Sequence, residues 1–123
     1  MRTIRLIAVL GVTIVVAAGC GSSSKKLSYS AFIDKANTIC RTGSAEVKGA
    51  KSSAAAGTIL DKYVPQLKAL KPPDVLQPYL DTFISTTEQE VEALKKNDEK
   101  TFNAVNVKNN EAASKMGTKE CIG

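Results

Sequence analysis

The stretch that decides the fold of this chain runs from Tyr29 to Cys40 and reads YSAFIDKANTIC. Its apolar residues recur at steps of three and four, which places them on one face of a helix. Ser28 or Ser30 is expected to cap the start of that helix with its side-chain oxygen. The same apolar face continues through three later residues: Val47, Ala50 and Ala54.

Two glycines weaken this first helix before it ends. Gly43 and Gly49 each cost about 1 kcal/mol relative to alanine, so the helix is expected to bend there or to fray toward Ser52-Ser53. The first clear break is predicted at Gly57-Thr58, because glycine is a helix stop and threonine a cap for the next helix.

Proline residues shape the middle of the chain. The second apolar run, from Ile59 to Leu70, contains Pro65, which is expected to kink the helix or split it into two short pieces. Pro72-Pro73 ends this segment. Asp74 then favours the start of a third helix, whose apolar stripe continues to Leu94.

A tight turn is predicted at Asn97-Asp98, where asparagine stops one helix and aspartate caps the next. The fourth helix is expected from Glu99 to Met116, closed by Gly117, with Phe102 among its inward residues. No segment alternates with period two for long enough to indicate a strand. We therefore predict an all-α fold, a small four-helix bundle with one proline-kinked helix.

The first 19 residues have the composition of a bacterial lipoprotein signal peptide. Arg2 and Arg5 precede a 13-residue apolar run, residues 6–18, and Gly19-Cys20 follow it, so that the stretch closes as Ala17-Ala18-Gly19-Cys20. A membrane-spanning helix needs about 20 apolar residues. The segment resembles a lipobox, with Ala17 where leucine is commoner. Cleavage before Cys20 would leave its thiol as the site of a thioether-linked diacylglycerol, and fatty acyl chains such as palmitate would anchor the protein. The alternative is an ordinary signal peptide cut nearby, with Cys20 incidental.

The signal divides the chain into three parts and sets its location. Residues 1–19 are the expected signal peptide, residues 20–27 the lipidated cysteine with a flexible polar linker, and residues 28–123 the helical domain. We expect the mature protein outside the cytoplasm, anchored to the outer face of the bacterial cell membrane. The membrane, reached through the lipid on Cys20, is therefore its first expected partner.

Two cysteines remain in the domain, and we predict that Cys40 and Cys121 form a disulfide. An even pair in an oxidising compartment favours such a bond, which would close a loop of about 80 residues and staple a modest core. A redox or metal site is the alternative, but the chain has no histidine and no CxxC spacing. No metal and no cofactor are expected.

Charge and composition also bear on function. Without the signal, the chain has 15 basic and 12 acidic residues, a net charge of +3, and no tryptophan. Nucleic-acid binding needs a concentrated basic face with stacking aromatics, so nucleic acid is not an expected partner. Glu88 and Glu92 share a helix face and could hold a cation or act in acid–base chemistry. A solvated face beside Lys95 and Lys96 is the favoured interpretation, and we expect no catalytic residues and no enzyme.

Three short motifs carry a resemblance to a family. Phe32 to Cys40 fits F-I-x-x-A-[ND]-x-I-C, Leu70 to Pro73 fits L-x-P-P, and Gly117 to Cys121 fits G-x-x-x-C. The mature chain resembles small secreted or lipid-anchored helical proteins of actinobacteria. The resemblance implies a small helical bundle stapled by the two cysteines, and it implies no activity and no catalytic residues.

Two functions remain open. The first is a non-enzymatic interaction or structural module that binds an envelope protein. Such a module should have a filled core and an exposed apolar patch. The alternative is a carrier that holds a lipid or other apolar ligand between its helices. A carrier should have an apolar cavity of some hundreds of Å³, lined by aromatic residues from this set: Tyr29, Phe32, Tyr63, Tyr79 or Phe83.

Overall fold

A computed structural model describes residues 25–123, which are all-helical and contain no strand. The signal peptide, Cys20 and most of the predicted linker lie outside the described residues. Leu27 already belongs to the domain, because its amide donates a 2.7 Å hydrogen bond to the Lys71 carbonyl and its side chain packs against the core. No helix among residues 25–123 combines the length and apolar character needed to cross a membrane.

Helix α1 spans Tyr29–Lys48 and begins where a serine cap was expected. The Ser28 hydroxyl accepts a 3.2 Å hydrogen bond from the Ala31 amide, which satisfies one of the free donors of the first turn. The helix stops at Gly49. Ala50 and Ala54, which the apolar spacing had added to its face, therefore lie outside it.

The predicted first break at Gly57-Thr58 is wrong. Helix α2 spans Ser53–Asp61, with Gly57 in its interior, and it begins because the Ser52 hydroxyl accepts a 3.1 Å hydrogen bond from the Ala55 amide. A Cβ atom at Gly57 would lie only 3.0 Å from the Val91 carbonyl oxygen. This glycine therefore lies inside α2 and allows it to approach α4 closely.

The expected effect of Pro65 is confirmed. The second helical segment divides into α2 and a short α3, Val64–Lys68, with Pro65 in the first turn of α3. Proline is tolerated there because the amide it lacks would have no intrahelical partner.

The second half of the chain is a helical hairpin. A short 3₁₀ turn, η2 (Asp74–Leu76), leads into α4, Gln77–Lys95, and α5 spans Glu99–Met116 as predicted. Between them, Asn97 adopts a positive φ of 56°, and the Asp98 carboxylate accepts a 3.0 Å hydrogen bond from the Thr101 amide. Gly117, at φ 76°, closes α5 in the left-handed conformation and precedes η3, Lys119–Cys121.

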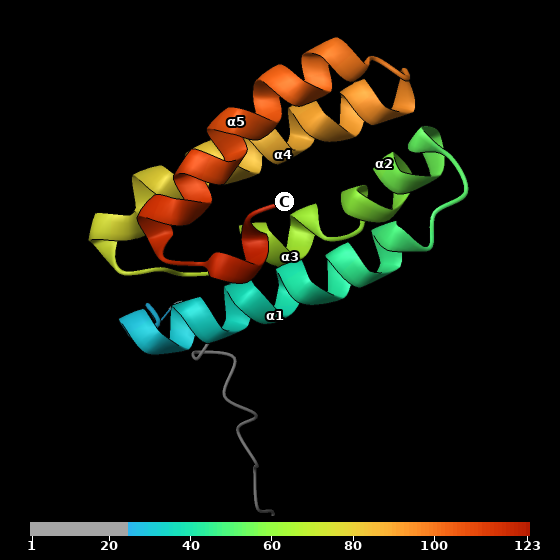
Figure 1. The fold of residues 1–123 in the computed structure, drawn as a ribbon. Coiled ribbons are helices and arrows are strands. Elements are labelled where there is room, and N and C mark those ends of the chain that lie inside the picture. The colour runs from blue at the N-terminus through green and yellow to red at the C-terminus, as the bar shows by residue number, and fades with distance from the viewer. Residues whose placement is uncertain (1–24) are drawn as a thin grey trace, which may run out of the picture.

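The bundle consists of two layers (Figure 1). One layer consists of α4 and α5, which run antiparallel side by side. The other layer consists of α1 with α2 and α3, and α2 and α3 also contact α4. Together, α2 and α3 act as the fourth member of the bundle. The core lies between these layers and includes Phe32, Leu67, Leu80, Phe83 and Met116. All core residues lie between Leu27 and Cys121, so this part of the chain carries its own hydrophobic core.

Candidate functional site

The predicted disulfide between Cys40 and Cys121 is present. It joins the middle of α1 to η3, with the two Cα atoms 4.9 Å apart. The same junction contains a hydrogen bond of 3.0 Å from the Glu120 amide to Asn37 Oδ1. An ion pair between Arg41 and the Glu120 carboxylate, at 3.7 Å, adds to it. Residues 119–121 are therefore fixed against α1, as a structural staple requires.

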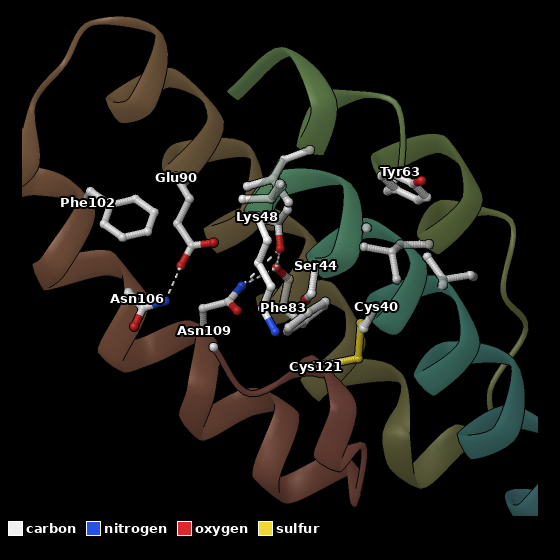
Figure 2. A pocket seen from close by; sticks show the side chains of 17 residues that line it. Cys40, Ser44, Lys48, Tyr63, Phe83, Glu90, Phe102, Asn106, Asn109 and Cys121 are labelled. Atoms are coloured by element: carbon white, nitrogen blue, oxygen red, sulfur yellow. Dashed lines mark hydrogen bonds between the residues drawn. A yellow bond between two sulfur atoms is a disulfide. The ribbon is translucent and has the colours of Figure 1, made fainter. Parts of the chain in front are cut away.

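Beside this staple, the helices border a cavity of about 330 Å³ that is partly open to solvent (Figure 2). Its walls come from α1, from the end of α2 and the start of α3, and from α4 and α5. Both bonded cysteines contribute to the lining. The rest is mainly apolar and includes the following side chains: Ile39, Val47, Leu60, Leu67, Phe83 and Phe102.

The aromatic residues proposed as a ligand lining divide into two groups. Tyr63 and Phe83 line the cavity. Phe32, with no exposed surface, belongs to the packed core, Tyr79 packs against that core, and Tyr29 is 51% exposed at the start of α1. The cavity therefore uses two of the five proposed aromatics and adds Phe102, which had been placed on the inward face without a binding role.

Tyr63 is held in position by α1. Its hydroxyl donates a 2.6 Å hydrogen bond to Glu46 Oε1, and Lys62 Nζ donates a 3.0 Å bond to Glu46 Oε2. The hydrogen bond from Tyr63, followed by that from Lys62, lowers the pKa of Glu46, and the same bond to Glu46 raises the pKa of Tyr63. Its ring lies against Gly43, where a Cβ atom would be 3.3 Å from the ring. The absence of a side chain at Gly43 thus lets the ring form one wall of the cavity.

One carboxyl group in the cavity was missed by sequence reasoning, which considered its neighbours on α4. Glu90 is only 6% exposed, and its Oε1 accepts a 3.1 Å hydrogen bond from Asn106 Nδ2 on α5. Burial raises the pKa of Glu90 to about 7, against the opposing effect of that hydrogen bond. The signal that could have found it is helical spacing, because Glu90 follows Phe83 by seven residues and Thr87 by three.

A second amide of α5 has a structural role next to this carboxyl group. Asn109 Nδ2 lies 2.9 Å from both the Thr86 and Thr87 hydroxyl oxygens and 3.1 Å from the Phe83 carbonyl oxygen. Asn109 is buried, so these bonds satisfy its Nδ2 group and fix α5 against α4. Together with Glu90 and Asn106 it forms a polar strip along one wall of the cavity (Figure 2).

The two carboxylates considered earlier lie away from this strip. Glu88 forms an ion pair with Lys68, and Glu92 forms one with Lys96 at 3.4 Å. All four side chains are about half exposed or more, which agrees with a solvated helix face. Across residues 25–123, no group of three or more His, Cys, Asp or Glu side chains is placed to hold a metal ion.

Comparison with protein-family models, with curated proteins and with solved structures found no match to this chain. The resemblance to small actinobacterial helical proteins therefore stays a prediction. The lipid on Cys20 also stays a prediction, because that residue lies outside the described part of the chain.

Proposed function

We propose that this protein is a membrane-anchored extracytoplasmic carrier that holds a small apolar molecule between its helices. The observation that carries the proposal is the cavity of about 330 Å³ with mainly apolar walls. Small-molecule sites in proteins are typically apolar concavities of about 300–1,000 Å³ with a few polar groups.

The cavity supports a carrier over an interaction module. A module that acts only through its surface needs no apolar cavity, whereas here the helices leave a partly open one beside the packed core and the disulfide. The large exposed apolar side chains, such as Val75 and Val107, lie on different elements. Two pairs of polar groups in the cavity, Asn106 with Glu90 and Asn109 with Thr87, are hydrogen-bonded between α5 and α4, which holds this wall of the cavity in place.

The proposed lipid anchor fits this function. A lipid on Cys20 would tether the domain by a segment that spans at most about 20 Å between Cys20 and Lys25. The cavity would then stay close to the membrane, where apolar molecules concentrate.

The proposal is tested with a soluble chain that starts at Gly21 and an uncharged apolar dye, N-phenylnaphthylamine, whose fluorescence rises on leaving water. We expect saturable binding of one dye molecule per chain. Ser44 lines the cavity from α1, so Ser44→Phe should fill space there and weaken dye binding at least about tenfold.

Ala45 provides the matched control, because it is the next residue on α1 and is exposed outside the cavity. Ala45→Phe should leave dye binding unchanged. Absence of saturable binding to the wild-type chain, or equal weakening by both substitutions, would contradict the carrier proposal.

A further inference from the structure

We propose that Glu90 receives the polar end of the carried molecule, and that this end is a protonated amine. The ligand class is thus a small cationic amphiphile, with its apolar part against α1 and Tyr63 and its nitrogen at α4. This inference rests on the proposed carrier function and identifies the chemistry of its ligand.

The first support is the position of the Glu90 carboxyl group. Its Oε1 is bonded to Asn106, whereas Oε2 accepts no hydrogen bond from any residue between 25 and 123. No side-chain oxygen in that part of the chain is both fully buried and without a partner, so Oε2 keeps some accessible surface. Figure 2 shows this oxygen directed away from Asn106, and Glu90 itself lines the cavity. The free acceptor thus faces the space that a ligand would occupy.

The second support is the lack of a countercharge. No lysine or arginine among residues 25–123 lies within ion-pair distance of Glu90. Burial raises the pKa of this group to about 7, because an ionised carboxylate is costly in an apolar site unless a cation pairs with it. A ligand ammonium would supply that cation. An alcohol would supply only a hydrogen bond, and a second carboxylate would be repelled.

The other ionisable side chains of the cavity do not supply the missing charge. Lys48, on α1, lines the cavity and is exposed. It forms no ion pair with Glu90, and its long side chain can turn its ammonium to water while its stem covers apolar surface. Tyr63 is neutral, because its bond to Glu46 raises its pKa. The residues that α5 presents to the cavity are uncharged: Phe102, Asn106 and Asn109.

The experiment compares three displacers of N-phenylnaphthylamine that share one alkyl chain and differ in head group: octylamine, octanol and octanoate. At about pH 8, we expect octylamine to bind at least about tenfold more tightly than octanol, and octanoate to bind most weakly. Equal binding of octylamine and octanol, or tightest binding of octanoate, would overturn the inference. Displacement by octanol without any advantage for octylamine would leave the carrier function standing, whereas failure of the dye to bind would remove both.

Two variants assign the preference to a residue. Glu90→Gln keeps the acceptor for Asn106 and removes the charge, so it should abolish the advantage of octylamine. Lys48→Met removes the other charge at the cavity and should preserve that advantage. Retention of the preference in Glu90→Gln, or its loss in Lys48→Met, would contradict the assignment.

The wild-type chain offers a measurement that does not depend on any variant folding. If octylamine binds only to the ionised carboxylate, its affinity should rise about 30-fold between about pH 5.5 and about pH 8.5. Octanol affinity should change little over the same interval. A flat profile for octylamine would overturn the inference.

Discussion

Replacement of Glu90 by glutamine is expected to stabilise the folded chain, and to do so far more at alkaline than at acid pH. The folded state raises the pKa of this group from 4.5 to about 7, so it binds the proton more tightly than the unfolded state does. The free energy of unfolding therefore falls as the pH rises from about 4.5 to about 7. Above that range the loss of stability is complete. A shift of this size corresponds to about 3 kcal/mol.

Glutamine carries no charge at any of these pH values and can still accept the hydrogen bond from Asn106. The substitution should therefore change stability little near pH 5 and should raise the free energy of unfolding by about 2 to 3 kcal/mol near pH 8. Urea unfolding followed by far-ultraviolet circular dichroism at these two pH values measures the difference.

Glu88→Gln is the matched control, because Glu88 lies on the same helix but is half exposed and paired with Lys68. Loss of that surface ion pair should cost no more than about 1 kcal/mol, and the control should show no gain in stability at alkaline pH. A gain for Glu90→Gln that is the same at both pH values would refute the reasoning, because it would place the effect in packing rather than in ionisation.

Three further predictions concern the rest of the chain. Cys40→Ser opens a disulfide between residues separated by 81 positions, and it should lower the free energy of unfolding by about 4 to 5 kcal/mol on the chain-entropy model; an unchanged melting temperature would contradict the staple. Gly57→Ala should destabilise the fold by about 1 to 3 kcal/mol, because its methyl group would meet the α4 backbone at 3.0 Å. Gly49→Ala, where the nearest atom is at 3.4 Å, should be nearly neutral, and equal effects in thermal unfolding would refute the close-approach argument. An alkyne fatty acid fed to cells should label the wild-type protein and not Cys20→Ser; equal labelling would exclude Cys20 as the lipid site.

Helix boundaries could be predicted from the sequence wherever local chemistry decides them. The turn at Asn97-Asp98 and the stop at Gly117 depend on a side-chain cap and on left-handed backbone, both of which residue type indicates directly. Gly57 was misplaced because its role comes from a neighbour more than 30 residues away in the sequence. The same residue type marks a helix end in one place and a close helix contact in the other, and only the tertiary structure distinguishes them.

The candidate site was harder to predict from the sequence than the helix boundaries were. The pairing of Cys40 with Cys121 follows from there being two cysteines in the domain and is confirmed. A cavity, in contrast, depends on space that side chains leave unfilled, and apolar periodicity assigns cavity residues and core residues alike to the inward face. Phe83 and Phe32 have the same pattern, yet only Phe83 lines the cavity. Glu90 was overlooked because a glutamate on a charged helix is usually solvated.

Nuclear magnetic resonance can establish whether an apolar molecule binds inside the cavity. Titration of octanol into the isotope-labelled soluble chain should shift the backbone amide signals of cavity residues saturably, with Gly43, Tyr63 and Asn106 among the most affected. Amides of η2, whose residues do not line the cavity, should remain unshifted. Absence of saturable shifts, or shifts confined to η2, would contradict the proposal that the helices enclose a ligand.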